Sequence, residues 1–213
     1  MAARCAVLGM GKLGSAFARR VVRSGHNCVV WNRTRAKAEA VVATVNNGNH
    51  HASGEAAEVE SDPAGIKAGV CVAADTPHEA VSMLAPNSLV VMILSNTAAV
   101  ANTLESGDLR QALDGHTLCN LTTGSPDDGR ETARSIAAWR ESGQANVGLI
   151  DGAYCGGPDK VEKGIGSLFV SADESVEASV RPQGQEIVED WQGVLSCAGE
   201  VGWFHIRMFL TSF

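Results

Sequence analysis

The sequence predicts an α/β fold: a doubly wound, mainly parallel sheet with helices on both faces. Gly9, Gly11 and Gly14 give a G-x-G-x-x-G spacing directly after the apolar run 5–8. Short apolar runs then alternate with helical patterns of about ten residues or more, which is typical of parallel strands joined by helices. Polar or glycine-containing junctions follow several of these runs, at 9–14, 32–34, 95–97, 122–126 and 152–158. Ligands of such sheets bind beyond the carboxyl ends of the strands, so we expect these junctions to form a site along one edge.

The first strand and helix carry the strongest local signal. The first glycine of the motif permits a tight turn, the second lets the backbone approach a pyrophosphate, and the third lets the helix pack closely on the strand. An alanine-rich helix is expected over 15–24, ending at Gly25, and a second apolar strand over 28–31. The free N–H groups at the start of that helix favour phosphate. An ordinary strand-to-helix turn is the alternative, but this context favours a Rossmann-type dinucleotide site.

The rest of the chain continues the alternation after one interruption. A surface helix is expected over 35–44, and the polar stretch 46–65 lacks any apolar period, which predicts a flexible insertion. Its adjacent histidines, 50 and 51, are more typical of a solvated loop than of metal ligands. The further expected strands are 70–73, 88–94, 117–121, 148–151 and 167–172, with a turn at 86–87, and the further expected helices are 77–84, 97–104, 128–141 and 185–196.

Composition excludes several functional classes. The formal charge of −7 on 213 residues argues against nucleic acid or an anionic membrane as the main partner. The longest strongly apolar run, 89–94, is far too short to cross a membrane. The six cysteines are scattered without a C-x-x-C pair, so neither a disulfide framework nor a zinc site is indicated. We therefore expect a cytoplasmic protein with reduced cysteines and no bound metal.

The residues after the second strand point to one of the two nicotinamide dinucleotides. An acidic residue at that position would bind the ribose hydroxyls of NAD and repel a 2′-phosphate. The chain instead has Asn32, Arg33 and Thr34, of which the arginine can clamp a phosphate with two hydrogen bonds. Arg35 and Lys37 are equally well explained as the solvated first turn of a helix. The pattern predicts NADP(H) as the cofactor.

Several motifs, in order along the chain, resemble a known superfamily. Gly-Met-Gly-Lys-Leu-Gly at 9–14, followed by Trp-Asn-Arg-Thr at 31–34, resembles the N-terminal domain of the β-hydroxyacid dehydrogenases, which include 6-phosphogluconate and 3-hydroxyisobutyrate dehydrogenases. Asn-Leu-Thr-Thr-Gly-Ser-Pro at 120–126 and Asp-Gly-Ala at 151–153 are similar to segments of the NADPH-dependent imine reductases, the most similar group. Cys-Gly-Gly-Pro at 155–158 is similar to the Ser-Gly-Gly-Pro substrate loop of the hydroxyacid enzymes. The resemblance covers about residues 4–200.

The resemblance implies a role for each junction. The glycine turn would contact the pyrophosphate, the end of the second strand the 2′-phosphate, the next two loops the adenosine side and the nicotinamide, and the last loop the substrate. In that order the residues are Gly9, Met10, Gly11, Lys12, Leu13 and Gly14; Asn32, Arg33 and Thr34; Leu94 and Ser95; Thr122 and Thr123; and Cys155, Gly156 and Gly157.

Members of the superfamily continue into an all-helical domain that supplies the proton-transfer residue and most of a homodimer interface. Here we expect an NADP-binding domain over 1–198, followed by a short atypical tail over 199–213 in place of that domain. Tyr154, the only tyrosine, is the candidate proton donor, with packing against the sheet edge as its alternative role. Asp151 is expected to anchor the following loop through backbone N–H groups.

Two functions follow from this pattern. The first is an NADPH-dependent oxidoreductase that transfers hydride to or from a C=N or C=O carbon of a small molecule, such as an imine or an oxo or hydroxy acid. The second is a catalytically inactive NADP-binding module, or a truncated product that only binds or interacts. Both hypotheses expect the cofactor to bind, and they differ on turnover.

Overall fold

The computed structural model describes residues 3–50, 69–172, 194–197 and 203–208. Its centre is a nine-stranded sheet in the order β3-β2-β1-β4-β5-β6-β7-β9-β8. The first six strands in this order are parallel, and β7, β9 and β8 continue the sheet antiparallel. The strands are β1 Ala3–Leu8, β2 Cys28–Trp31, β3 Cys71–Ala73, β4 Leu84–Met92, β5 Thr117–Asn120, β6 Gly148–Cys155, β7 Gly166–Ala172, β8 Val194–Cys197 and β9 Trp203–Met208.

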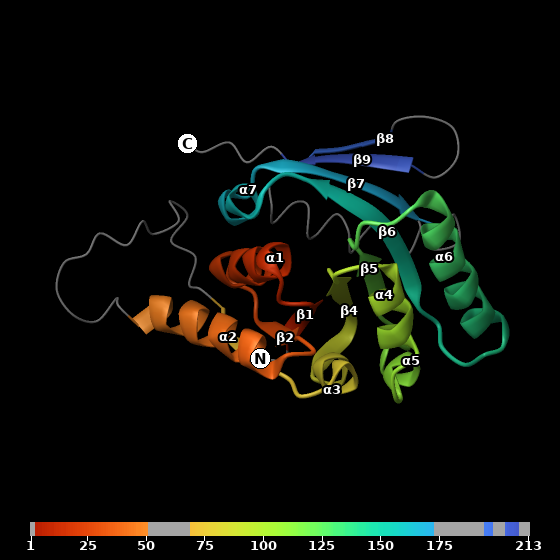
Figure 1. Ribbon diagram of the computed structural model, residues 1–213, viewed down its shortest axis with the longest axis horizontal. Coiled ribbons are helices and arrows are strands. Elements are labelled where there is room, and N and C mark those ends of the chain that lie inside the picture. The colour runs from red at the N-terminus through yellow and green to blue at the C-terminus, as the bar shows by residue number, and fades with distance from the viewer. Residues whose placement is uncertain (1–2, 51–68, 173–193, 198–202, 209–213) are drawn as a thin grey trace.

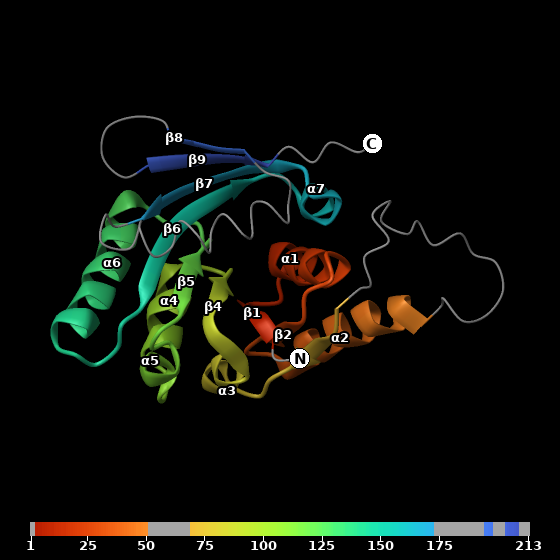
Figure 2. The same cartoon turned by 180° about the vertical axis from the view of Figure 1, so that it is seen from behind.

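Helices cover both faces of this sheet (Figures 1 and 2). Side chains alternate along β1, so Val7 belongs to the core under α1, α2 and α7, whereas Leu8 belongs to the core under α3, α4, α5 and α6. This arrangement and the strand order confirm the predicted doubly wound, Rossmann-type fold. The helices are α1 Lys12–Arg23, α2 Arg35–His50, α3 Pro77–Ser82, α4 Thr97–Leu104, α5 Leu109–Ala112, α6 Pro126–Glu141 and α7 Pro158–Lys163.

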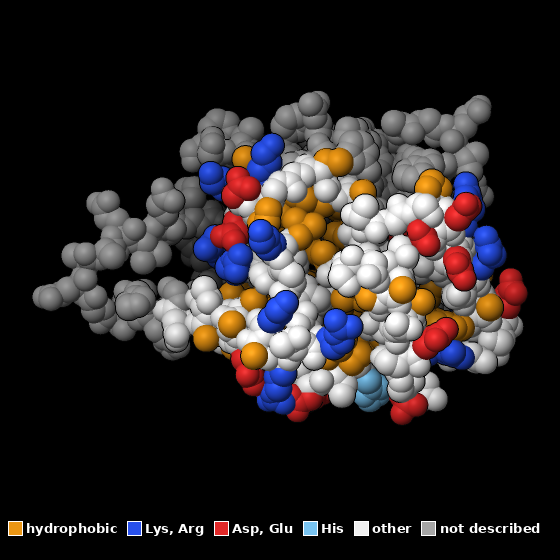
Figure 3. Space-filling model, in the orientation of Figure 1, with side chains coloured by type: hydrophobic (Ala, Val, Ile, Leu, Met, Phe, Trp, Pro, Cys, Tyr) orange, Lys and Arg blue, Asp and Glu red, His pale blue; other side chains and the backbone are white. Residues whose placement is uncertain are grey.

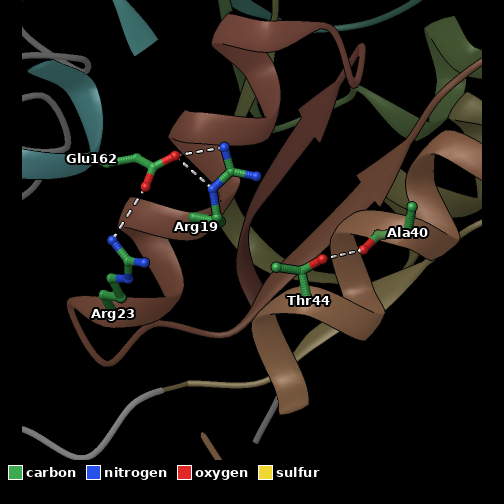
Figure 4. Close-up of polar contacts among 5 residues, drawn as sticks. All are labelled: Arg19, Arg23, Ala40, Thr44 and Glu162. Carbon is green, nitrogen blue, oxygen red and sulfur yellow. Dashed lines mark hydrogen bonds and ion pairs between the residues drawn. The ribbon is translucent and has the colours of Figure 1, made fainter. Parts of the chain in front are cut away.

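Helix α2 is longer than predicted and includes the first residues of the expected insertion. The side chain of Asn46 donates to the Cys71 carbonyl at 2.9 Å and accepts the Cys71 N–H at 3.1 Å. One side chain of α2 thus bonds both the N–H and the carbonyl of Cys71 on the edge strand β3. These two bonds hold the extended helix against the sheet. Within the helix, the Thr44 hydroxyl donates to the Ala40 carbonyl at 2.8 Å (Figure 4). Residues 51–65 of the expected insertion lie outside the described residues.

The boundary between α3 and β4 also differs from the prediction. The helix ends at Ser82, and β4 begins at Leu84, so the expected turn at 86–87 lies inside a strand. Asn87 keeps a turn-like conformation with φ 57°. Pairing of Leu84 with Ala3 extends the ladder to the start of β1, past a register shift. Long-range pairing therefore outweighs the local turn signal.

The last elements were predicted least well. The strand expected over 148–151 continues as β6 to Cys155, and α5 and α7 were not predicted. The helix expected over 185–196 is wrong at its end, because β8 occupies 194–197 and pairs with β9. Residues 185–193 lie outside the described residues. Strand β9, at 203–208 in the expected tail, pairs antiparallel with β7.

Within the described residues, no helix combines the length and the apolar composition needed to cross a lipid bilayer.

Candidate cofactor-binding site

The loops that follow β1, β2, β4 and β5 leave the sheet side by side. Backbone bonds continue between them where the strands end: Gly9 N–H donates to the Trp31 carbonyl at 2.8 Å, Ile93 N–H to the Leu8 carbonyl at 2.9 Å, and Leu121 N–H to the Met92 carbonyl at 2.8 Å. The carboxyl edge therefore brings together the glycine turn, the Asn32 loop, the Leu94 loop and the Thr122 loop, as the sequence predicts.

The three glycines of the turn meet three different environments. Gly9 has φ +109°, and a Cβ there would lie 2.1 Å from the Ile93 carbonyl oxygen. A Cβ on Gly14 would lie 1.9 Å from the Gly9 carbonyl oxygen, so the helix and the turn approach too closely for any side chain. A Cβ on Gly11 would meet no atom within 4 Å. Gly9 and Gly14 are required by the fold, whereas Gly11 leaves an open space above the turn.

That open space lies at the beginning of α1. Gly11 is the N-cap residue, no side chain caps the helix, and its first turn contains no acidic residue. The first N–H groups of a helix have no partner within the helix and attract anions. Lys12 is exposed beside them. A dinucleotide pyrophosphate needs free N–H donors, space close to the backbone and a nearby cation. The start of α1 offers all three, so the residues fit this ligand.

Asn32 joins two of the loops. Its Oδ1 accepts the Met10 N–H at 3.0 Å, and its Nδ2 donates to the Thr34 carbonyl at 3.0 Å. An aspartate could accept the first bond but could not donate the second. The sequence assigned Asn32 and Met10 to phosphate contacts, and the structure engages both in this link between the glycine turn and the start of α2.

Of the two arginines that follow Asn32, Arg35 is paired with carboxylates and Arg33 pairs with none that the structure describes. Arg35 pairs with Glu39 at 2.7 Å and with Asp75, which supports its reading as a surface residue of the helix. Arg33 is exposed and makes no hydrogen bond or ion pair with any residue that the structure describes. Figure 3 shows a central hollow with hydrophobic side chains on the face that it draws, and lysine and arginine side chains at several points around it.

A hydrogen-bonded chain fixes the loops after β4 and β5. The Thr122 Oγ1 accepts the Leu94 N–H at 3.0 Å, and the Thr122 N–H donates to Asn120 Oδ1 at 3.1 Å. The Nδ2 of Asn120 donates to Asp151 Oδ1 at 2.9 Å. Thr122 is therefore buried and already hydrogen-bonded within the protein, whereas its neighbour Thr123 is exposed.

Asn120 was missed as a site residue, although a polar amide at the end of an apolar strand was the available signal. Asp151 was misplaced: it lies within β6, and its carboxylate accepts this amide instead of loop N–H groups.

These residues line a cavity of about 160 Å³ between α4, α6 and the edge of the sheet. Burial raises the pKa of Asp151, and the hydrogen bond from Asn120 opposes this shift. The N-terminus of α6 is closed by Ser125 and Asp128, whose side chains each bond the other's backbone N–H, and the Ser125 hydroxyl bond lowers the pKa of the Asp128 carboxyl. The start of α6, unlike that of α1, is therefore already capped.

Tyr154 lies at the end of β6, at the head of the expected substrate loop. Its hydroxyl donates to the Ile165 carbonyl at 2.7 Å, and its ring meets Phe17 edge to face with centroids 5.7 Å apart. Burial, with smaller contributions from nearby Asp159 and Cys155, raises the pKa of Tyr154 to about 12. The phenol therefore packs against α1 and keeps its proton.

The expected substrate loop is shaped around this tyrosine. A Cβ on Gly156 would lie 2.9 Å from the Tyr154 hydroxyl, Gly157 is the N-cap of α7, and Cys155 is exposed.

An ion-pair cluster ties this loop region to α1 (Figure 4). Glu162 of α7 accepts from Arg19 Nε of α1 at 2.7 Å and contacts Arg23 Nη1 at 3.4 Å. The Arg19 and Glu162 side chains are only 24% and 26% exposed, so solvent screens this pair less than a surface pair. The helix that follows the expected substrate loop is thus held on the helix that begins at Gly11.

Comparison with known proteins agrees with this geometry. A family model described as the NAD-binding domain of 6-phosphogluconate dehydrogenase matches residues 4–194. An NADPH-dependent reductive aminase of Aspergillus oryzae is 29% identical over 138 residues, which are 65% of this chain and 37% of that protein.

Solved structures show the same likeness. A reductive aminase from Aspergillus terreus, in complex with NADPH and ethyl-5-oxohexanoate, is 26% identical with a TM-score of 0.54, covering 75% of this chain and 43% of that one. An imine reductase from Myxococcus stipitatus, in complex with NADP+, shares the fold at 24% identity and a TM-score of 0.61, covering 85% of this chain and 51% of that one. This chain thus spans about half of the length of these relatives, or less than half.

Proposed function

Since this chain belongs to the family of the NAD-binding domain of 6-phosphogluconate dehydrogenase, we propose that it binds NADP(H) for hydride transfer to or from a C=N or C=O carbon of a small molecule. The observation that carries the proposal is the open position at Gly11 over the uncapped start of α1. The N–H groups of Lys12 and Leu13 are the donors that would hold the pyrophosphate there.

Arg33 supports the choice of NADP(H) over NAD(H). It is exposed at the carboxyl end of β2, where a dinucleotide places its adenosine ribose, and its guanidinium is not consumed by any described carboxylate. Asn32 carries no charge that would repel a 2′-phosphate, and its amide instead holds the loop from which Arg33 projects. The Thr34 hydroxyl is an additional exposed donor.

The remaining loops would orient the cofactor and the substrate. Leu94 and Ser95 border the adenosine side and Thr123 the nicotinamide side, and 155–157 border the substrate. Bound NADPH supplies the hydride, and the chain contributes binding, orientation and exclusion of water. Tyr154 stays the proposed proton donor: its raised pKa keeps the proton on the oxygen at neutral pH, and donation requires release of the Ile165 carbonyl.

The bond between Tyr154 and Ile165 also favours a second function, an NADP-binding module without turnover. If the phenol serves only to anchor the loop, no other tyrosine exists in the chain to replace it. Homodimer formation and a cytoplasmic location belong to the proposal as well. Cys5, Cys28, Cys71, Cys119 and Cys155 are free thiols, which fits a reducing compartment.

The experiment compares NADPH and NADH binding in two charge-reversal variants. Arg33→Asp should weaken NADPH at least tenfold and NADH little, because only NADPH carries the 2′-phosphate. Lys37→Asp is the matched control: it changes the net charge equally from an exposed position on α2 and should affect both cofactors alike. Equal weakening of the two cofactors by Arg33→Asp would contradict the 2′-phosphate assignment.

A panel of cyclic imines and oxo acids then separates the two functions. Oxidation of NADPH with any of them, reduced by Thr123→Ala or Tyr154→Phe, supports the oxidoreductase. Binding of NADPH without turnover across the panel supports the binding module.

A further inference from the structure

We propose that Asp151, Asn120 and Thr122 form a positioning chain that sets the nicotinamide end of the cofactor site independently of its adenosine end. The proposal rests on the proposed function. This series of hydrogen bonds runs from the Asp151 carboxylate on β6, through the Asn120 amide at the end of β5 and then Thr122, to the loop after β4. It thereby connects three successive segments of the carboxyl edge by bonds that each involve a side chain.

Each link of the chain has only one chemical direction. The Asn120 amide donates to Asp151 with its nitrogen and accepts the Thr122 N–H with its oxygen, at 2.9 and 3.1 Å. Thr122 Oγ1 accepts the Leu94 N–H at 3.0 Å. An ionised aspartate at position 120 could accept but not donate, and would face the Asp151 carboxylate. With a carboxylate at position 151, the sequence of donors and acceptors therefore requires an amide at position 120.

Burial makes these bonds specific. Asn120 is 4% exposed and Thr122 is 6% exposed, so a broken bond leaves a buried polar group without its partner. Close packing adds to this from α6, where a Cβ on Gly129 would lie 2.7 Å from Asp151 Oδ2. The carboxylate is thus held between a helix on one side and the Asn120 amide on the other.

The exposed hydroxyl of Thr123 takes its position from this chain. On one side its backbone follows the fixed Thr122, and on the other it precedes Gly124, where a Cβ would lie 2.5 Å from Thr97 Cγ2. Neither neighbour can shift without breaking a buried bond or meeting α4. None of the chain's bonds reaches Gly11 or Arg33, and its one link toward the adenosine side ends at the Leu94 N–H. The segment before Leu94 is held separately, by the Ile93 N–H bond to the Leu8 carbonyl at 2.9 Å. Disturbing the chain should therefore move mainly the nicotinamide end.

The test uses the full chain and two ligands, NADPH and adenosine 2′,5′-bisphosphate, which carries the adenosine half without nicotinamide. Asn120→Asp, at pH 8, should weaken NADPH at least tenfold and leave the bisphosphate within twofold of the wild type. The double variant Asn120→Asp with Asp151→Asn exchanges donor and acceptor and restores the bond in reverse. It should return NADPH binding to within threefold of the wild type.

A second pair of variants covers the case in which Asn120→Asp does not fold. Thr122→Val keeps the shape but removes the acceptor of the Leu94 N–H, and Thr122→Ser keeps that acceptor. The first should lose NADPH affinity at least tenfold with the bisphosphate unchanged, and the second should lose less than threefold.

The outcomes separate the two proposals. A wild-type chain that binds neither ligand overturns the proposed function. If the wild type binds both, the positioning chain is overturned by variants that keep NADPH, by variants that lose both ligands together, or by a double variant that restores nothing.

Discussion

Replacing Gly11 with alanine should weaken NADPH binding at least tenfold without destabilising the fold. The backbone of Gly11 has φ −76° and ψ −175°, which alanine adopts without strain, and the new Cβ would meet no atom within 4 Å. The free energy of unfolding should therefore change by less than about 0.5 kcal/mol. The methyl group would, however, occupy the space over the first N–H groups of α1. A phosphate oxygen bonded to those groups lies only about 2.9 Å from the nitrogen.

Gly14→Ala provides the contrasting variant in the same turn. Its Cβ would lie 1.9 Å from the Gly9 carbonyl oxygen, so either α1 or the turn must move. Overpacking of this kind costs about 1–3 kcal/mol, and we expect at least that loss in urea unfolding. Gly11→Ala should differ from it by losing about 1.4 kcal/mol or more of binding free energy, the equivalent of tenfold, with an unchanged melting temperature.

Titration with NADPH and with adenosine 2′-monophosphate, which lacks the pyrophosphate, is the deciding assay. Gly11→Ala should reduce the affinity for NADPH and leave that for the monophosphate unchanged. Wild-type affinity for NADPH in this variant would refute the pyrophosphate assignment. A melting temperature as low as that of Gly14→Ala would refute the claim that position 11 is open.

Two further predictions concern stability. Glu162→Gln should lose about 0.5–1 kcal/mol in urea unfolding, because its pair with Arg19 is largely shielded, whereas Glu39→Gln, in an exposed pair, should lose at most about 0.5 kcal/mol. Equal losses would contradict the distinction. Burial lowers the pKa of His116 from its ordinary 6.5, so the folded state disfavours the protonated ring. The contribution of neutral His116 to the free energy of unfolding is fully present above pH 6.5 and is lost as the pH falls below that value. In urea titrations between pH 7.5 and 5.5, His116→Gln should therefore make the free energy of unfolding depend less on pH.

The sequence predicts the parallel half of the fold well because its signals there are local. The glycine spacing and the run of alternating elements are each encoded within a few residues. The antiparallel half depends on which distant segment pairs with which. The Gln185 region favours a helix by composition, yet Val194–Cys197 pairs with β9, and β9 with β7. No local propensity identifies such partners.

The same limit applies to the site. Arg33 and Gly11 could be predicted as ligand contacts because charge and the absence of a side chain are properties of single residues. Asn32, Asn120 and Asp151 could only be assigned once their partners were known, since an amide or carboxylate at a strand end suits a ligand and a neighbouring loop equally well. All three bond to the protein itself. A polar residue at the carboxyl edge therefore indicates that a site is present but not which residues contact the ligand.

The residues of the carboxyl edge fall into two sets, those whose side chains bond to other described residues and those whose side chains do not, and the two sets have different consequences for binding. Asn32, Asn120 and Thr122 are occupied by bonds that hold successive loops together. Gly11, Arg33 and Thr123 are exposed, and we predict that they contact the ligand directly. Loops fixed before the cofactor arrives lose little conformational freedom when it binds, so more of the contact energy remains as affinity. Changes in the first set should weaken binding by displacing neighbouring groups and should be rescued by restoring the bond. Changes in the second set remove or block a direct contact, and no substitution elsewhere in the chain should rescue them.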